Sequence, residues 1–89
     1  MDFKQEALWI IGVDRRRIVL LAFKSRKILH PSIIAEEVKR SIQNISHALH
    51  EMEERGFVES IDEKNTWHNY MLTKKGERIL KEVEKLLGQ

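Results

Sequence analysis

The fold of this 89-residue chain is decided by residues 31–59, which read PSIIAEEVKRSIQNISHALHEMEERGFVE. Apolar residues recur there at helical spacing in two short runs, which predicts two helices joined by a tight turn and followed by a strand. Pro31 suits a helix start, Ser41 the cap of the second helix, and Gly56 its left-handed stop. The residues expected to be buried are Ile33, Ile34, Ala35 and Val38 in the first helix, and Ile42, Ile45, Leu49 and Met52 in the second.

The exposed side of the second helix is predicted to be polar but uncharged near its start. Gln43, Asn44 and His47 are expected to share this face, with Ser41 and Ser46 close by. Short side chains that donate and accept hydrogen bonds can reach base edges in the major groove of DNA. An ordinary solvated helix face is the plainer explanation of the same residues, but the surrounding pattern favours DNA binding.

The length and composition of the chain suit one compact domain. Domains this small often gain stability by pairing, so a homodimer is plausible. The sequence has no cysteine, which excludes disulfides and thiolate metal sites. The longest apolar run, residues 18–23, is too short to span a bilayer, and the N-terminus lacks the features of a signal peptide. We therefore expect a cytoplasmic protein with no membrane partner.

Charge is distributed unevenly along the chain, although the formal net charge is only +2. Residues 15–40 contain eight Lys and Arg against two Glu, whereas residues 41–63 contain six Asp and Glu against Arg55 alone. This pattern predicts one basic and one acidic side of the fold. The plainer explanation is that such charges only solvate helix faces.

The N-terminal flank of the central stretch is predicted to form two helices. An apolar stripe from Phe3 to Ile11 ends at Gly12, and Asp14 is the expected cap of a helix that runs to about Lys27. The residues expected on the buried side of this second helix are Ile18, Val19, Leu21 and Ala22.

The C-terminal flank is predicted to form a β-hairpin and a last helix. Residues 57–61 and 66–72 suit two strands around a turn at 62–65. Tyr70 is expected in the core, while Trp67 is left open between wing, dimer contact and packing. Thr73 is a good cap for the final amphipathic helix.

Three helices, a hairpin and a final helix in this order make a winged helix-turn-helix, a mainly α fold with a small β-hairpin. The chain also resembles MarR/ArsR-like transcription regulators, especially the small archaeal type, through RRI at 16–18, IAEEV at 34–38, ISHAL at 45–49, ERGFVE at 54–59 and YMLTKKG at 70–76. We expect one domain over 1–89, divided into an N-terminal helical extension at 1–12, a winged-helix core at 14–72 and a C-terminal helix at 73–89.

The resemblance implies sequence-specific binding of double-stranded DNA by a dimeric transcription regulator. A recognition helix at about 41–55 would enter the major groove and a wing at about 57–72 would touch flanking DNA. The implied base contacts are Ser41, Gln43, Asn44, Ser46 and His47, and the implied backbone contacts are Arg15, Arg16, Arg17, Lys39, Arg40 and Lys64. The implied dimer contacts, on the two terminal helices, are Phe3, Leu8, Ile11, Ile79, Leu80, Val83, Leu86 and Leu87. The other arrangement is that both terminal helices fold back on their own domain.

Three other functions are alternatives to DNA binding. His47 and His50 stand three residues apart on one helix, but they lack clear third and fourth metal ligands, so we expect no metal and no cofactor. An enzyme is not expected, because the chain has no Gly-rich phosphate loop, no cysteine nucleophile and no evident serine, histidine and acid set. The serious alternative is a winged helix that binds protein within a transcription or RNA-processing assembly. The sequence leaves any small-molecule effector open.

Overall fold

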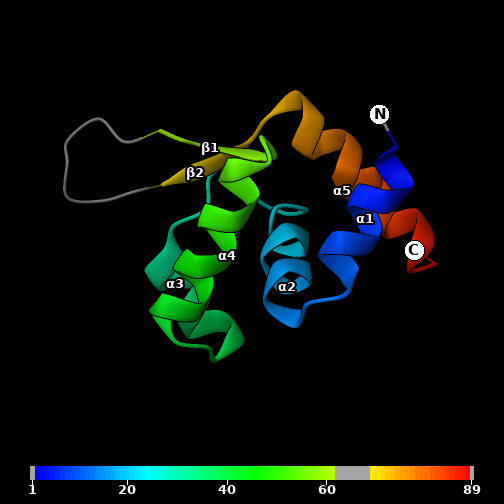
Figure 1. Cartoon of the computed structure of the whole chain (residues 1–89). Helices are drawn as coiled ribbons and strands as arrows, with labels where there is room; N and C mark the ends of the chain where they lie inside the picture. The colour runs from blue at the N-terminus through cyan, green and yellow to red at the C-terminus, as the bar shows by residue number, and fades with distance from the viewer. Residues whose placement is uncertain (1, 62–68, 89) are drawn as a thin grey trace.

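The structure is a computed structural model, and it describes residues 2–61 and 69–88. Within these ranges it is mainly helical with a two-stranded antiparallel sheet, which confirms the winged helix-turn-helix fold (Figure 1). The elements in chain order are α1 (Phe3–Ile11), α2 (Asp14–Ala22), α3 (Pro31–Val38), α4 (Ile42–Glu54), β1 (Val58–Ser60), β2 (Tyr70–Leu72) and α5 (Lys74–Leu86).

The helix-turn-helix is formed by α3 and α4, and local signals fix its ends. Pro31 occupies the first turn of α3, and Lys39 ends that helix in the left-handed region at φ 60°. The Ser41 hydroxyl then accepts a hydrogen bond of 3.0 Å from the backbone N–H of Asn44 and so caps α4. Gly56, at φ 81°, follows α4 and turns the chain toward β1. The predicted cap at Ser41 and the left-handed Gly56 are therefore confirmed.

The core lies beneath the inner side of α4. Ile45, Ala48, Leu49 and Met52 are all completely buried, as three of them were predicted to be. Residues from the neighbouring elements complete this core, among them Val19, Leu20, Leu29, Ile34, Phe57 and Val58. This packing holds α4 by one side and leaves the other side outward.

Two isoleucines predicted to be buried are instead exposed. Ile33 on α3 is 46% exposed and Ile42 at the start of α4 is 47% exposed. Helical spacing fixes the angle of a side chain around the helix axis, but it does not fix whether another element covers that turn. Ile33 also precedes the buried Ile34 by one residue, which places it about 100° away around α3.

The second helix is shorter than predicted, and its buried side includes the predicted Val19, with Leu21 and Ala22 packed at the edge of the core, but also Leu20, which was not predicted. It ends at Ala22 rather than near Lys27, and its fully buried residues are Val19 and Leu20. Val13 occupies the cap position and provides no side-chain hydrogen bond, so the expected cap at Asp14 is wrong. The chain leaves the helix early because Leu29 pairs with Tyr70 through backbone hydrogen bonds of 2.8 and 3.1 Å, which require an extended segment.

The base of the wing is the β1–β2 hairpin, in which Val58 pairs with Leu72 and Ser60 with Tyr70. Tyr70 is 4% exposed and belongs to the core, as predicted. The expected turn at 62–65, Lys64 and Trp67 lie outside the described residues.

The hairpin is joined to α5 through Thr73 and Gly76. The Thr73 hydroxyl caps α5 by accepting from the Gly76 N–H at 3.0 Å, and it lies 2.6 Å from the Gly56 carbonyl oxygen, to which it donates. A Cβ atom at Gly76 would overlap the backbone carbonyl of Phe57. The LTKKG motif therefore needs its glycine because α5 crosses the backbone after α4 at close range.

The terminal helices α1 and α5 pack against each other beside the winged helix (Figure 1). Ala7 and Ile10 on α1 and Ile79 and Val83 on α5 have no exposed surface. Every helix in the described ranges falls short of the length and apolar character that a membrane crossing requires.

Candidate nucleic-acid interface

The outward side of α4 forms a shallow open groove of about 400 Å³, lined by Gln43, Ser46, His47, His50, Glu51 and Glu54. Gln43 is exposed and the His47 side chain is 62% exposed, so both can reach a ligand that lies along the helix. The first half of this face is polar without formal charge, and the second half is acidic. Because phosphate groups repel carboxylates, only the N-terminal half suits close approach to DNA.

Asn44 does not share this face, contrary to the prediction. It is half-buried, and its Oδ1 atom is enclosed without a hydrogen-bond partner among the described residues. The physical reason is helical geometry: Asn44 stands one residue before Ile45 and four before Ala48, both fully buried, so its side chain is turned toward the core side of α4. Ser46 is also half-buried, whereas Ser41 is exposed but uses its oxygen to cap α4.

Lys39 and Arg40 form a pair of exposed cations in the turn before α4. Lys39 has no ion pair within the described part of the chain, and an Arg40 Nη2 atom lies 4.0 Å from Asp14 Oδ2, a long and solvent-exposed contact. The turn also adjoins the positive end of the α4 dipole. These two side chains are therefore available to anions near the start of the helix.

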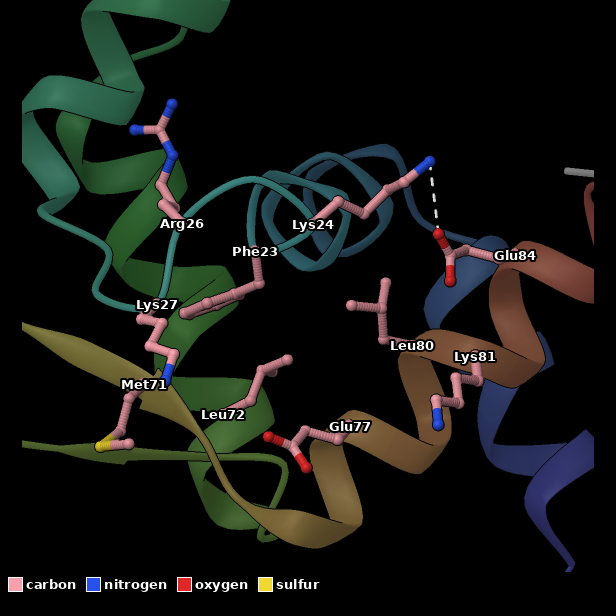
Figure 2. A pocket seen from close by; sticks show the side chains of 10 residues that line it. All are labelled: Phe23, Lys24, Arg26, Lys27, Met71, Leu72, Glu77, Leu80, Lys81 and Glu84. Carbon is pink, nitrogen blue, oxygen red and sulfur yellow. Dashed lines mark ion pairs between the residues drawn. The ribbon is translucent and has the colours of Figure 1, made fainter.

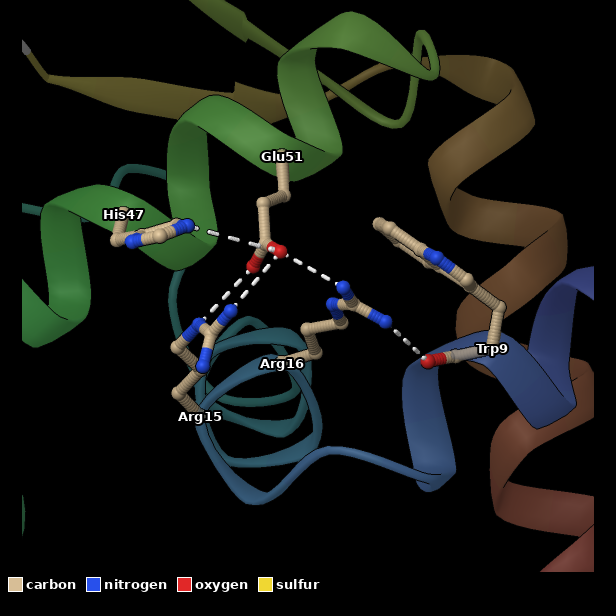
Figure 3. Close-up of polar contacts among 5 residues, drawn as sticks. All are labelled: Trp9, Arg15, Arg16, His47 and Glu51. Carbon is tan, nitrogen blue, oxygen red and sulfur yellow. Dashed lines mark hydrogen bonds and ion pairs between the residues drawn. The ribbon is translucent and has the colours of Figure 1, made fainter.

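Arg15 and Arg16, in contrast, are held by one carboxylate on α4 (Figure 3). Arg15 donates to Glu51 through Nε and Nη2, both at 3.0 Å, and Arg16 Nη2 donates to Glu51 at 2.7 Å. Arg16 also donates to the backbone oxygen of Trp9 at 3.0 Å. The third arginine of the run, Arg17, pairs with Asp14 at 2.7 Å. The arginine run thus ties α2 to α4 and to α1.

The arginines strongly perturb Glu51. The hydrogen bond from Arg16 is the largest cause that lowers the pKa of Glu51 to about 2, and Arg15 adds to it, while partial burial acts in the opposite direction. The Glu51 side chain is only 17% exposed. His47 Nε2 lies 3.8 Å from Glu51 Oε2, so the carboxylate lies next to the exposed His47 in the groove along α4.

An aromatic cluster secures α1 to this network. The Trp9 ring lies between two guanidinium groups, with Arg16 at 3.8 Å and Arg55 at 4.0 Å from its centroid. The same ring meets Phe57 edge to face at a centroid separation of 6.0 Å. Sequence reasoning missed both Trp9 and Glu51, because their partners lie on other elements and no local spacing reveals them.

The predicted dimer contacts divide into three groups. Leu8, Leu86 and Leu87 are exposed, and Phe3, Ile11 and Leu80 are partly buried. Ile79 and Val83 have no exposed surface, so assigning them to a dimer contact was wrong. They lie on the side of α5 that faces away from solvent and belong to the protomer's own core.

A separate pocket of about 380 Å³ lies between the segment after α2, strand β2 and helix α5 (Figure 2). Phe23, Leu72 and Leu80 supply its apolar surface, and an ion pair between Lys24 Nζ and Glu84 Oε2 at 3.3 Å lies at its edge. No residue of this pocket lines the groove along α4. Its volume is in the range that holds small organic ligands.

The His47 and His50 pair does not form part of a metal centre in the described part of the chain. There, no three His, Asp or Glu side chains come together in a way that would hold a metal ion. The predicted backbone contact Lys64 and the wing aromatic Trp67 lie outside the described ranges, so neither can be placed in this site.

These features define a winged helix-turn-helix domain with an additional helix at each end. Among solved structures it is similar to TubR bound to 24 bp of tubC from Bacillus thuringiensis serovar israelensis, with a TM-score of 0.83 and 18% identity over 97% of this chain and 96% of that one. A mutant of the plasmid segregation protein TubR gives a TM-score of 0.83 at 17% identity, over 100% and 96% of the two chains.

The fold is also similar to that of a mutant MarR from E. coli complexed with operator DNA. The TM-score is 0.73 at 19% identity, and the match covers 98% of this chain and 64% of MarR. No protein-family model and no curated protein matches the sequence. At these identities the likeness establishes the winged-helix fold.

Proposed function

We propose that this protein binds double-stranded DNA in a sequence-specific manner, as a homodimer that regulates transcription. In this proposal α4 enters the major groove and the β1–β2 wing touches flanking DNA. The observation that carries the proposal is the outward N-terminal half of α4. It presents polar, uncharged side chains next to two exposed cations, Lys39 and Arg40, while its inner side is fully buried.

Base recognition is assigned chiefly to Gln43, with contributions from Ser41, Ser46 and His47. A glutamine amide both donates and accepts, which suits a bidentate contact with adenine worth about 1–3 kcal/mol of discrimination. Asn44 takes part only if its half-buried amide turns outward on binding, and its unpaired Oδ1 atom lowers the cost of that movement.

Phosphate binding is assigned to Lys39 and Arg40, with Arg17 and Lys64 as further candidates. The sequence predicts that Arg15 and Arg16 contact phosphates as well. Their shared contact with Glu51 supports a different role, in which they fix the orientation of α4 against α2. Arg15, Arg16 and Glu51 together carry one net positive charge, which still favours nearby DNA.

The proposed dimer contact is formed by the exposed leucines of α1 and α5, namely Leu8, Leu86 and Leu87. The partly buried Phe3, Ile11 and Leu80 would border it. A two-fold axis through these helices would present two copies of α4 to successive major grooves, about 34 Å apart, on a near-palindromic site.

A second candidate setting is DNA segregation. It is favoured by the likeness to TubR, a plasmid segregation protein, which spans nearly the whole of both chains. DNA binding through α4 is common to both settings.

The direct test is selection of bound sequences from a random DNA pool at two salt concentrations, followed by affinity measurements on the selected site. The proposal predicts an enriched motif, a specific affinity that exceeds random binding, and an affinity that falls steeply with salt. No enrichment and no salt-dependent binding would contradict it and would favour the protein-interaction alternative.

The dimer is tested separately by analytical ultracentrifugation. We expect the natural protein to sediment as a dimer and Leu86→Asp to sediment as a monomer, because a buried unpaired carboxylate is costly at an apolar contact. Lys85→Asp is the matched control, since it introduces the same aspartate side chain at the neighbouring exposed position. Equal behaviour of the two variants would contradict this placement of the contact.

A further inference from the structure

The first residue of α4 is an isoleucine that the fold leaves in solvent. Ile42 is 47% exposed and lies between the capping residue Ser41 and the exposed Gln43. Within the described residues it is the one large apolar side chain of α4 that is exposed. Packing within the protomer therefore does not explain why this residue is apolar.

Local helix stability does not explain Ile42 either. A β-branched side chain loses rotamer freedom in a helix, and many polar residues suit the first turn as well or better. The exposed half of the Ile42 side chain gains nothing from contacts within the protomer. The residue type at this position is better accounted for by an apolar partner outside the protomer.

The surroundings of Ile42 indicate what that partner is. Its chain neighbours are Lys39, Arg40, Ser41 and Gln43, which are all exposed and either polar or cationic. A protein partner usually needs a contiguous apolar patch of several hundred Å². A lone apolar side chain among cations instead suits a small apolar group on a polyanion.

DNA offers one such group in the major groove, the C5-methyl of thymine. We propose that Ile42 contacts a thymine methyl group and so gives the protein a preference for thymine beside the base read by Gln43. This inference rests on the proposed function, because it requires α4 to enter the groove by its N-terminal end. Ile42 then acts as a specificity-determining residue through apolar contact alone.

The experiment uses the site selected from the random pool, with each thymine replaced in turn by deoxyuridine. This replacement removes only the methyl group and leaves base pairing and the O4 acceptor intact. Affinities are measured by fluorescence anisotropy for the natural protein, Ile42→Ala and Ile33→Ala. Ile33 is the matched control, because it is the same residue with 46% exposure but lies on α3.

We expect one thymine in each half-site at which methyl loss weakens the natural protein about fourfold, and about fifteenfold when both half-sites are changed. Ile42→Ala should bind the thymine and uracil sites equally, while Ile33→Ala should keep the full difference. Circular dichroism should show both variants folded, since both side chains are exposed.

Three results would overturn the inference. One is specific DNA binding that is insensitive to methyl loss at every thymine, which leaves the proposed function intact. Another is methyl sensitivity that persists in Ile42→Ala. The third is a changed oligomeric state in Ile42→Ala alone, which would assign the side chain to a second copy of the chain. Absence of specific DNA binding would overturn the proposed function and this inference together.

Discussion

Two pairs of basic residues that look alike in the sequence have different surroundings in the fold. Arg15 and Arg16 share the carboxylate of Glu51, with contacts of 2.7 to 3.0 Å, while Lys39 and Arg40 are exposed at the turn before α4. In our proposal the first pair fixes the orientation of α4, and the second pair binds DNA phosphates near the N-terminus of that helix. Positive side chains that already pair with a carboxylate are less available to phosphates than exposed ones, so sequence clustering alone does not identify a DNA contact.

The largest expected effect is on DNA affinity and its dependence on salt, which should differ between variants of the two pairs. Replacing both Lys39 and Arg40 by alanine should weaken binding to every DNA sequence about a hundredfold and reduce the slope of log affinity against log salt by about two per protomer. Arg15→Ala should leave that slope nearly unchanged, because the Arg15 guanidinium is hydrogen-bonded to Glu51 and is not directed at a phosphate. An equal loss of slope in both variants, measured by titration at several salt concentrations, would remove the distinction.

The next effect is on stability, where the first pair should matter more than the second. Arg16→Ala should lower the free energy of unfolding by about 2.5 kcal/mol, since it removes contacts with Glu51 and with Trp9 on a side chain that is 14% exposed. Lys39→Ala should change it by less than about 0.5 kcal/mol. Urea denaturation followed by circular dichroism measures both. Similar values for the two variants would mean that the Glu51 network is not structural.

Acid should weaken the same network. The pKa of Glu51 is lowered from 4.5 to about 2, so its contribution is complete above about pH 4.5 and is lost as the pH falls toward 2. This contribution is on the order of 2 kcal/mol after allowance for screening by solvent. Glu51→Gln should be less stable at neutral pH and should lose less stability between pH 4.5 and 2.

The control for the acid experiment is Glu53→Gln, an exposed carboxylate two residues further along α4. It should retain the pH dependence of the natural protein over this window. If Glu51→Gln and the natural protein lost stability in parallel between pH 4.5 and 2, the assignment of the titrating group to Glu51 would be wrong.

Local signals in the sequence were enough to predict the fold. Ser41, Gly56 and Thr73 act within a few residues, and each occupies the helix end that was expected of it. The early end of α2 was not predictable in this way. It depends on pairing between Leu29 and Tyr70, which are far apart in the chain.

The candidate site was only partly predictable. Its location on α4 followed from the periodicity of the buried residues, but which polar residues share one face depends on angle, and Asn44 turned out to be half-buried. The partners of Arg15 and Arg16 lie about 35 residues away, as the Glu51 contacts show. Such partners are set by how the helices pack, so no local pattern identifies them.

The smallest of these effects tests the central claim most directly, namely that the outward N-terminal half of α4 reads base edges. The measurement is the ratio of affinities for the selected site and for random DNA, in the natural protein and in Gln43→Ala. The account predicts that this ratio falls about tenfold in Gln43→Ala while binding to random DNA is unchanged. An unchanged ratio, or an equal loss of affinity for both DNAs, would contradict it.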